Sequence, residues 1–193
     1  MNASSPTRHP SLLLLALAAF ALAGCGGGDD DHPLAPATPV QPISCTPQGG
    51  SGTAGLSLYG ATSYSGLSGA SSTSGTVVFD PGEIGYNNPN LASTARTGSL
   101  RAALWAVPYS YAGGGITGYV VATYAITFTG GGNQLYNFTS ANLAAHTLNA
   151  TTPPRGAYCM VVTLEQYDSV NCTSADRYCI VDWQQYATSA TFQ

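Results

Sequence analysis

The chain contains no lysine and very little charge of either sign. Its five arginines and nine acidic residues make up 7% of the 193 positions, against about 25% in an average soluble domain. Without lysine, neither a Gly-Lys-Ser phosphate loop nor Schiff-base chemistry is available. The formal charge of −4 offers no basic patch for a phosphate backbone, so we expect no nucleic-acid partner.

Motifs for catalysis and metal binding are missing as well. The sequence has no Gly-x-Ser-x-Gly elbow, no His-Glu-x-x-His and no Cys-x-x-Cys pair. Gly50, Gly52 and Gly55 have a Gly-x-Gly-x-x-Gly spacing, but no strand-like run precedes them and no helix-like run follows. His146 is in phase with Ala144 and Leu148, which favours a strand histidine over a catalytic one. We therefore expect no catalytic residue, no cofactor and no metal ion.

The N-terminal residues have the pattern of a targeting segment. Leu12 to Ala23 is an unbroken apolar run of 12 residues, which is too short to span a membrane as a helix but fits the core of a secretory signal peptide. The run ends in Leu22-Ala23-Gly24-Cys25, which resembles the lipobox of bacterial lipoproteins. The resemblance implies that residues 1–24 are removed and that Cys25 carries acyl chains such as palmitate.

The resemblance also implies a location. A lipoprotein is held in the bacterial cell envelope by its membrane anchor, and Gly26 after the cysteine is compatible with transfer to the outer membrane, on its periplasmic or its surface face. Residues 25–44 are rich in glycine, aspartate and proline, which predicts a tether. Asp29 to Asp31 beside His32 are expected to stay solvated. Residues 45–193 are then one folded domain.

The domain has the pattern of an all-β fold. Short runs rich in β-branched and aromatic residues alternate with glycine, proline and asparagine turns, and no window of 12 residues has a helical stripe. In one run, Tyr158, Met160, Val162 and Leu164 form a single face with a period of two. This predicts an antiparallel β-sandwich of about eight strands. The expected strands lie at residues 54–59, 62–67, 76–79, 100–106, 119–128, 135–138, 146–148, 157–166 and 178–186.

Two stretches carry a family resemblance. Thr97 to Ala106 is followed by a glycine-rich loop and Gly118-Tyr119, and Pro153 to Tyr158 leads into a valine-rich strand. These motifs resemble the immunoglobulin-like modules of bacterial exported proteins, such as cell-adhesion-related domains. The resemblance covers roughly residues 76 to 186. It implies an immunoglobulin-like sandwich that serves as a binding or spacer module.

Four cysteines remain after Cys25, and in an exported chain they predict two disulfides with three alternative connectivities. Cys172 and Cys179 flank a short loop, so the sequence favours their pairing, which leaves Cys45 to join Cys159. A Cys159–Cys179 bond would need a skewed register. A zinc site is the other alternative, and it lacks the spacing that zinc ligands usually show.

Acidic groups provide the remaining route to catalysis. Glu165 and Asp168 lie at the end of a strand and Asp182 lies in the next one, so a carboxylate pair acting on a glycoside is one hypothesis. Solvated or capping acids are the hypothesis we favour. Asp80 with Glu83, or Asp168 with Asp176, could bind calcium, but the spacing matches no standard calcium loop.

The 12 tyrosines are the residues that most suggest a binding surface. Tyr109 and Tyr111 lie beside a glycine run, and Tyr86 lies beside asparagines. Such rings offer rigid apolar area and a hydroxyl group for recognition. We therefore expect a non-enzymatic adhesion, scaffold or interaction module. A glycan-binding module that uses these three tyrosines is the alternative, and an envelope hydrolase is less favoured. The partners expected are the membrane, through the anchor, and an envelope protein or a glycan.

Overall fold

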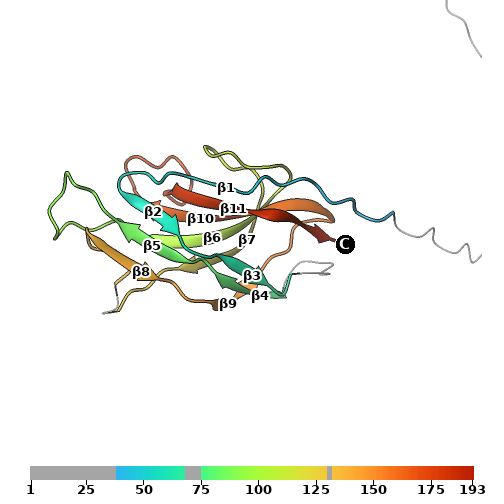
Figure 1. Cartoon of the computed structure of the whole chain (residues 1–193), viewed down its shortest axis with the longest axis horizontal. Helices are drawn as coiled ribbons and strands as arrows, with labels where there is room; N and C mark the ends of the chain where they lie inside the picture. Colours follow the sequence, from blue (N-terminus) through green and yellow to red (C-terminus); the bar gives the residue numbers. More distant parts are fainter. Residues whose placement is uncertain (1–37, 68–74, 130–131) are drawn as a thin grey trace, which may run out of the picture. The chain divides into compact units, whose positions relative to one another are not determined.

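The computed structural model describes residues 38–67, 75–129 and 132–193, which belong to one compact unit. The lipobox, Cys25 and residues 26–37 of the expected tether lie outside the described residues. The described part is an antiparallel β-sandwich without helices (Figure 1), so the expected all-β class is confirmed and is consistent with an immunoglobulin-like fold. Its eleven strands are β1 (Gln48–Gly49), β2 (Leu56–Tyr59), β3 (Ser63–Ser65), β4 (Gly75–Asp80), β5 (Glu83–Tyr86), β6 (Leu100–Val107), β7 (Tyr119–Ala125), β8 (Thr139–Asn142), β9 (His146–Ala150), β10 (Gly156–Tyr167) and β11 (Tyr178–Phe192).

The larger layer is a five-stranded sheet in the order β1-β11-β10-β6-β7. β10 lies at its centre and pairs with β6 on one side and β11 on the other. The predicted face of Tyr158, Met160, Val162 and Leu164 is buried in the main core, as the period of two requires. The register between β10 and β11 shifts at Cys159/Val161 and at Leu164/Glu165.

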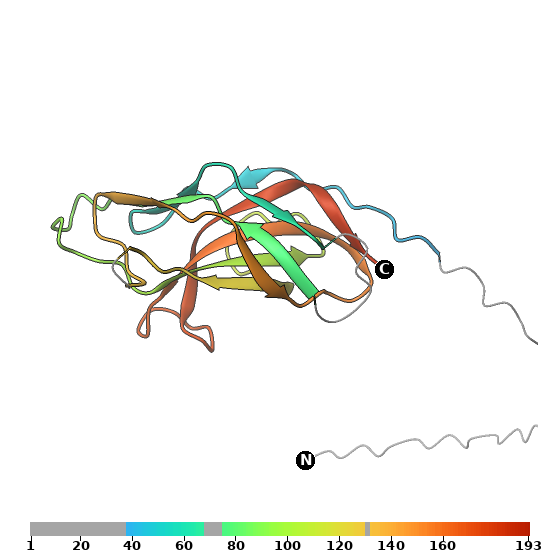
Figure 2. The same ribbon diagram turned by 90° about the horizontal axis from the view of Figure 1, so that it is seen from below.

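The smaller layer consists of two three-stranded ladders, β2-β5-β8 and β3-β4-β9. Each strand of the first ladder continues into one of the second, and the break falls at Gly60, Gly82 or Ala144, with φ of 79°, 86° and 52°. The pairing of Tyr59 with Glu83 and of Glu83 with Asn142 on one side, and of Ser63 with Asp80 and of Phe79 with His146 on the other, places the three breaks at the same level. We call this line of breaks the crease; Figure 2 shows the domain from another side. A bond from Leu143 N to Gly82 O, 2.9 Å long, joins two of the strands within the crease.

The crease explains the strand count. When each interrupted strand is counted once, the eleven strands reduce to eight. The sequence predicted about eight, but it counted residues 54–59 and 62–67 as separate strands. The expected strand at residues 135–138 is wrong, because β8 begins at Thr139, and β1 and β5 were not expected.

Side chains of β11 close the sandwich along the edge of β2. Asp182 Oδ2 accepts a hydrogen bond from Leu58 N at 2.7 Å, and Gln184 Nε2 donates to Leu58 O at 3.3 Å. The two side chains do for β2 what a neighbouring strand would do, because they satisfy a backbone donor and acceptor that would otherwise be buried unpaired. Asp182 is 4% exposed, so its carboxylate is part of the fold.

Both favoured disulfides are present. Cys45 joins Cys159 with 5.6 Å between the Cα atoms, and Cys172 joins Cys179 at 5.4 Å. The first bond connects the start of the domain to the central strand, and the second closes the loop between β10 and β11. The last residues of the expected tether, 38–44, belong to the compact unit, and Ile43 packs beside Cys45.

Candidate functional site

The central strand of the larger sheet is buried on both faces. One face of β10 meets the smaller layer, while Cys159 and Val161 face outward into a second apolar cluster with Tyr111 and Trp183. That cluster is covered by the segment before β1 and by the loop after β6, to which Tyr111 belongs. The outer face of this sheet is therefore partly covered and carries a small apolar core of its own.

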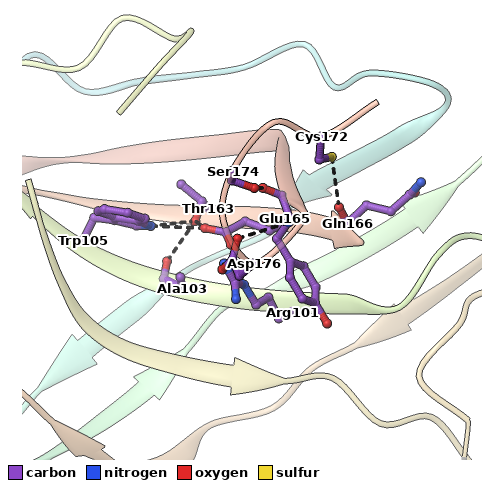
Figure 3. A network of polar contacts seen from close by, with 10 residues as sticks. Arg101, Ala103, Trp105, Thr163, Glu165, Gln166, Cys172, Ser174 and Asp176 are labelled. Carbon is purple, nitrogen blue, oxygen red and sulfur yellow. Dashed lines mark hydrogen bonds and ion pairs between the residues drawn. The ribbon is translucent and has the colours of Figure 1, made fainter. Parts of the chain in front are cut away.

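Next to this cluster, polar side chains gather around a buried carboxylate (Figure 3). Glu165 on β10 is 2% exposed. Its Oε2 accepts a 2.5 Å bond from Arg101 Nε, and its Oε1 accepts bonds from Thr163 Oγ1 at 2.8 Å and Trp105 Nε1 at 3.3 Å. The indole also donates to Thr163 at 3.1 Å. Both carboxylate oxygens are satisfied, as a buried charge requires.

Strand register brings these residues together. Arg101 and Glu165 are opposite each other across β6 and β10, and Thr163 is opposite Ala103. Because side chains two residues apart on a strand point to the same face, Arg101 and Trp105 both reach Glu165. The sequence contains an alternating pattern in each strand, but the ion pair follows only from the register between them.

Arg101 joins the sheet to the β10–β11 loop. Its Nη2 lies 2.5 Å from Asp176 Oδ2, and its guanidinium lies 3.9 Å from the centroid of the Tyr178 ring. Burial by itself lowers the pKa of Arg101, but the charges of Glu165 and Asp176 and the hydrogen bonds to them raise it above its ordinary value. The guanidinium therefore stays charged throughout the accessible pH range.

The same ion pair shifts the pKa of the Asp176 carboxyl downward. Partial burial by itself raises its pKa, but the hydrogen bond from Arg101, followed by the bond from Tyr178 N and the positive charge of Arg101, lowers the pKa below its ordinary value. Asp176 is thus ionised at neutral pH, and its side chain is 48% exposed.

A groove of about 440 Å³ lies over this network. We call it the Trp105 groove; its walls are apolar and aromatic, with the Arg101 ion pairs at one side, and it is lined by Arg101, Trp105, Ile116, Val120, Glu165, Thr173, Ser174, Asp176, Tyr178, Cys179 and Ile180. Its volume lies within the usual range for small-molecule sites. Because Trp105 and Arg101 are fixed by Glu165, the groove is pre-formed. Its acids are already engaged, so the arrangement supports binding better than proton transfer.

The three tyrosines considered for the alternative glycan-binding role are not brought together. Tyr109 is 47% exposed, but Tyr86 and Tyr111 are 5% and 1% exposed. Tyr86 lies in the core between the layers, and Tyr111 lies in the outer cluster, where its hydroxyl donates to Gly114 O at 2.6 Å and its ring packs edge-on against Trp183. Neither buried ring offers a face to a sugar.

The acids considered for hydrolysis are also separated. Leu164 is opposite Asp182 in the sheet and therefore shares its face, so Glu165 next to it points to the other face. Asp168 is at the surface and accepts bonds from the backbone of Val170 and Asn171. The bonds from the Asn171 side chain and backbone lower the pKa of Asp168.

His146 has a structural environment. Its ring stacks on Tyr124 with the centroids 3.9 Å apart, and its Nε2 lies 2.8 Å from Leu143 O. This agrees with the strand histidine that the sequence favours.

Within the described ranges, no group of three or more His, Cys, Asp or Glu side chains is placed to hold a metal ion, and no helix is long and apolar enough to cross a membrane. The chain matches no protein-family model, no curated protein and no solved structure.

Proposed function

We propose that this is a lipid-anchored protein of the bacterial cell envelope whose sandwich acts, without catalysis, as an adhesion, scaffold or interaction module. The observation that carries the proposal is the Cys45–Cys159 disulfide. It lies where a tether from Cys25 would enter the domain, and it joins that point to the central strand.

The placement of this disulfide suits a domain that bears load. β1 pairs with β11 only through Gln48 and Gly49, and so short a strand is easily pulled away. Cys159 is fully buried in β10, a strand paired with neighbours on both sides. Tension from a membrane anchor would enter the centre of the sheet through a covalent bond and bypass β1.

The engagement of the acids supports a role without catalysis. Both oxygens of Glu165 are bound by fixed donors, and Asp182 accepts from the backbone N–H groups of Leu58 and Trp183 at 2.7 and 2.8 Å. A general acid or base needs a free oxygen within reach of a substrate. These two carboxylates instead satisfy buried donors of the domain itself.

The anchor is tested by labelling the full chain in a Gram-negative host with an alkyne analogue of palmitate. We expect the wild-type chain to carry the label and to sediment with membranes. Cys25→Ala is expected to lose the label, and Cys45→Ala, which also removes a cysteine but not the lipobox one, is expected to keep it. Labelling that survives Cys25→Ala contradicts the lipoprotein assignment. A turnover-dependent activity that His146→Ala or Glu165→Gln abolishes contradicts the non-enzymatic role.

A further inference from the structure

An aromatic surface lies on the outer face of β2, β5 and β8, in the layer opposite the Trp105 groove. Ser57, Gly85 and Ser140 form one row across the three strands. Two exposed rings, Tyr59 and Phe138, border a hollow of about 360 Å³. We call this surface the Tyr59–Phe138 platform. Its lining also includes the hydroxyl and amide groups of Ser57, Asn87, Thr139 and Ser140, together with Gly85 and Tyr86.

The ring of Tyr59 lies across Gly85. A Cβ atom at Gly85 would stand 3.2 Å from Tyr59 Cε1 and 3.5 Å from its hydroxyl oxygen, so the absence of a side chain there lets the ring rest on the sheet. The hydroxyl donates to Glu83 Oε1 at 3.0 Å, which fixes the ring in place. The residue remains 38% exposed, and a fixed ring with one free face is a stacking surface.

Phe138 is held outward by a strained backbone. Its φ of 62° is left-handed, which is rare and strained for a bulky side chain. Its N–H donates to Tyr86 O at 2.7 Å and to Asn137 Oδ1 at 3.1 Å. Asn137 is 2% exposed and ties the neighbouring loop with bonds to the carbonyls of Asn88 and Leu91. The result is a ring that is 54% exposed, although glycine or asparagine would suit this backbone better.

The chemistry of the platform identifies its ligand class. The hollow is lined by aromatic rings and neutral hydroxyl and amide groups, with no acid in its lining. Glu83, which lies outside the lining, accepts a hydrogen bond from the Tyr59 hydroxyl. A surface that lies on lipid would carry lysine or arginine around its apolar residues, and the lining has neither. A pyranose presents C–H groups to a ring face and hydroxyl groups to neutral polar side chains.

We therefore propose that the Tyr59–Phe138 platform binds a neutral saccharide, with one sugar ring stacked on Tyr59 and a neighbouring unit against Phe138. Of the three tyrosines considered from the sequence, Tyr109 and Tyr111 lie outside this site, and Tyr86 is part of the lining but is only 5% exposed. The site adds a ligand class to the interaction module and does not depend on the lipid anchor.

The test uses the full chain in a zwitterionic detergent, because glycoside detergents would compete for the platform. Neutral oligosaccharides of four to six hexose or N-acetylhexosamine units are screened on an array, and binding is then measured by calorimetry. For the saccharide that binds, we expect Tyr59→Ala and Phe138→Gly each to weaken affinity about tenfold or more, because a stacked ring is lost. Glycine accepts the left-handed backbone at position 138, so that variant keeps the fold.

Two variants serve as controls. Tyr59→Phe keeps the ring and should retain most of the affinity, and Tyr136→Ala removes a ring that is 43% exposed but lies outside the hollow and should leave affinity unchanged. Absence of saccharide binding, binding of a protein in its place, or affinity that survives both ring deletions overturns the proposal. A labelled, membrane-bound chain that binds no saccharide rejects this inference alone. Saccharide binding by an unlabelled chain rejects the anchor alone.

Discussion

The ion pair beneath the Trp105 groove makes a quantitative prediction for the variant Arg101→Leu. In this variant Glu165 keeps its Oε1 bonds to Thr163 and Trp105 but loses the 2.5 Å bond to Oε2. Removing one partner of a buried pair costs about 3–5 kcal/mol, because the other charge is left uncompensated. The Arg101 side chain is 21% exposed, so water can reach its place. We therefore expect the low end, about 3 kcal/mol, or about 6–12 °C in melting temperature for a domain of this size.

The double variant Arg101→Leu/Glu165→Leu distinguishes the net contribution of the ion pair from the cost of leaving Glu165 without its partner. An apolar replacement of a buried ion pair is often neutral, so the double variant should recover most of the loss. Unfolding in urea, followed by tryptophan fluorescence and circular dichroism, gives the free energies. Arg155→Leu is the matched control, because Arg155 is exposed and bonds only the carbonyl of Thr38 among the described residues; its effect should stay within about 0.5 kcal/mol. A loss below about 1 kcal/mol for the single variant, or a double variant as unstable as the single one, refutes this account of Glu165.

Two further predictions concern other buried groups. Burial raises the pKa of Tyr186 to about 12, against a smaller lowering by the Thr62 side chain. The buried hydroxyl nevertheless makes no hydrogen bond of good geometry within the described residues. The folded state therefore favours the protonated phenol, and stability present below about pH 10 should fall as the pH rises toward 12. Tyr186→Phe should be neutral or slightly stabilising and should shift alkaline unfolding, followed by tyrosine absorbance, to higher pH; an unchanged alkaline midpoint would reject this role. The two disulfides should contribute differently to the free energy of unfolding. Loop closure predicts about 5 kcal/mol for Cys45–Cys159 and about 2–3 kcal/mol for Cys172–Cys179. Equal losses in urea melts of the two double Cys→Ala variants would contradict this order.

The sequence predicted those parts of the fold that depend on local pattern. The inner face of β10 followed from its alternation, and the pairing of Cys172 with Cys179 followed from their separation of 7 residues. The outer face of β10 was missed, because what covers Val161 comes from segments far away in the sequence, such as Tyr111 and Trp183. Long-range cover leaves no periodic signal in the strand that it buries.

Tyr86 shows how the crease limits prediction. Val77 and Phe79 point inward from β4, while Ile84 and Tyr86 point inward from β5, so the buried positions change from odd to even across Gly82. A shift of one residue in such a pattern moves every side chain to the opposite face. The asparagines beside Tyr86 suggested a recognition residue, although Tyr86 is 5% exposed and belongs to the core.

The platform was not predicted for a related reason. Tyr59 is a stacking surface only because Gly85 of another strand lies beneath its ring. Phe138 is exposed only because its backbone is left-handed. The contact between Tyr59 and Gly85 and the φ angle of Phe138 both depend on the tertiary structure. Neither can be predicted from the neighbouring residues in the sequence.

The crease also divides the smaller layer into two parts that can unfold locally and independently of each other. Local unfolding spreads through contiguous cooperative structure, and a break at Gly60, Gly82 and Ala144 interrupts all three strands at one level. β2-β5-β8 can then exchange its amide hydrogens while β3-β4-β9 stays protected. A ligand on the platform would slow exchange on one side of the crease and leave the other side unchanged, so that half the layer reports occupancy and the other half serves as its internal reference.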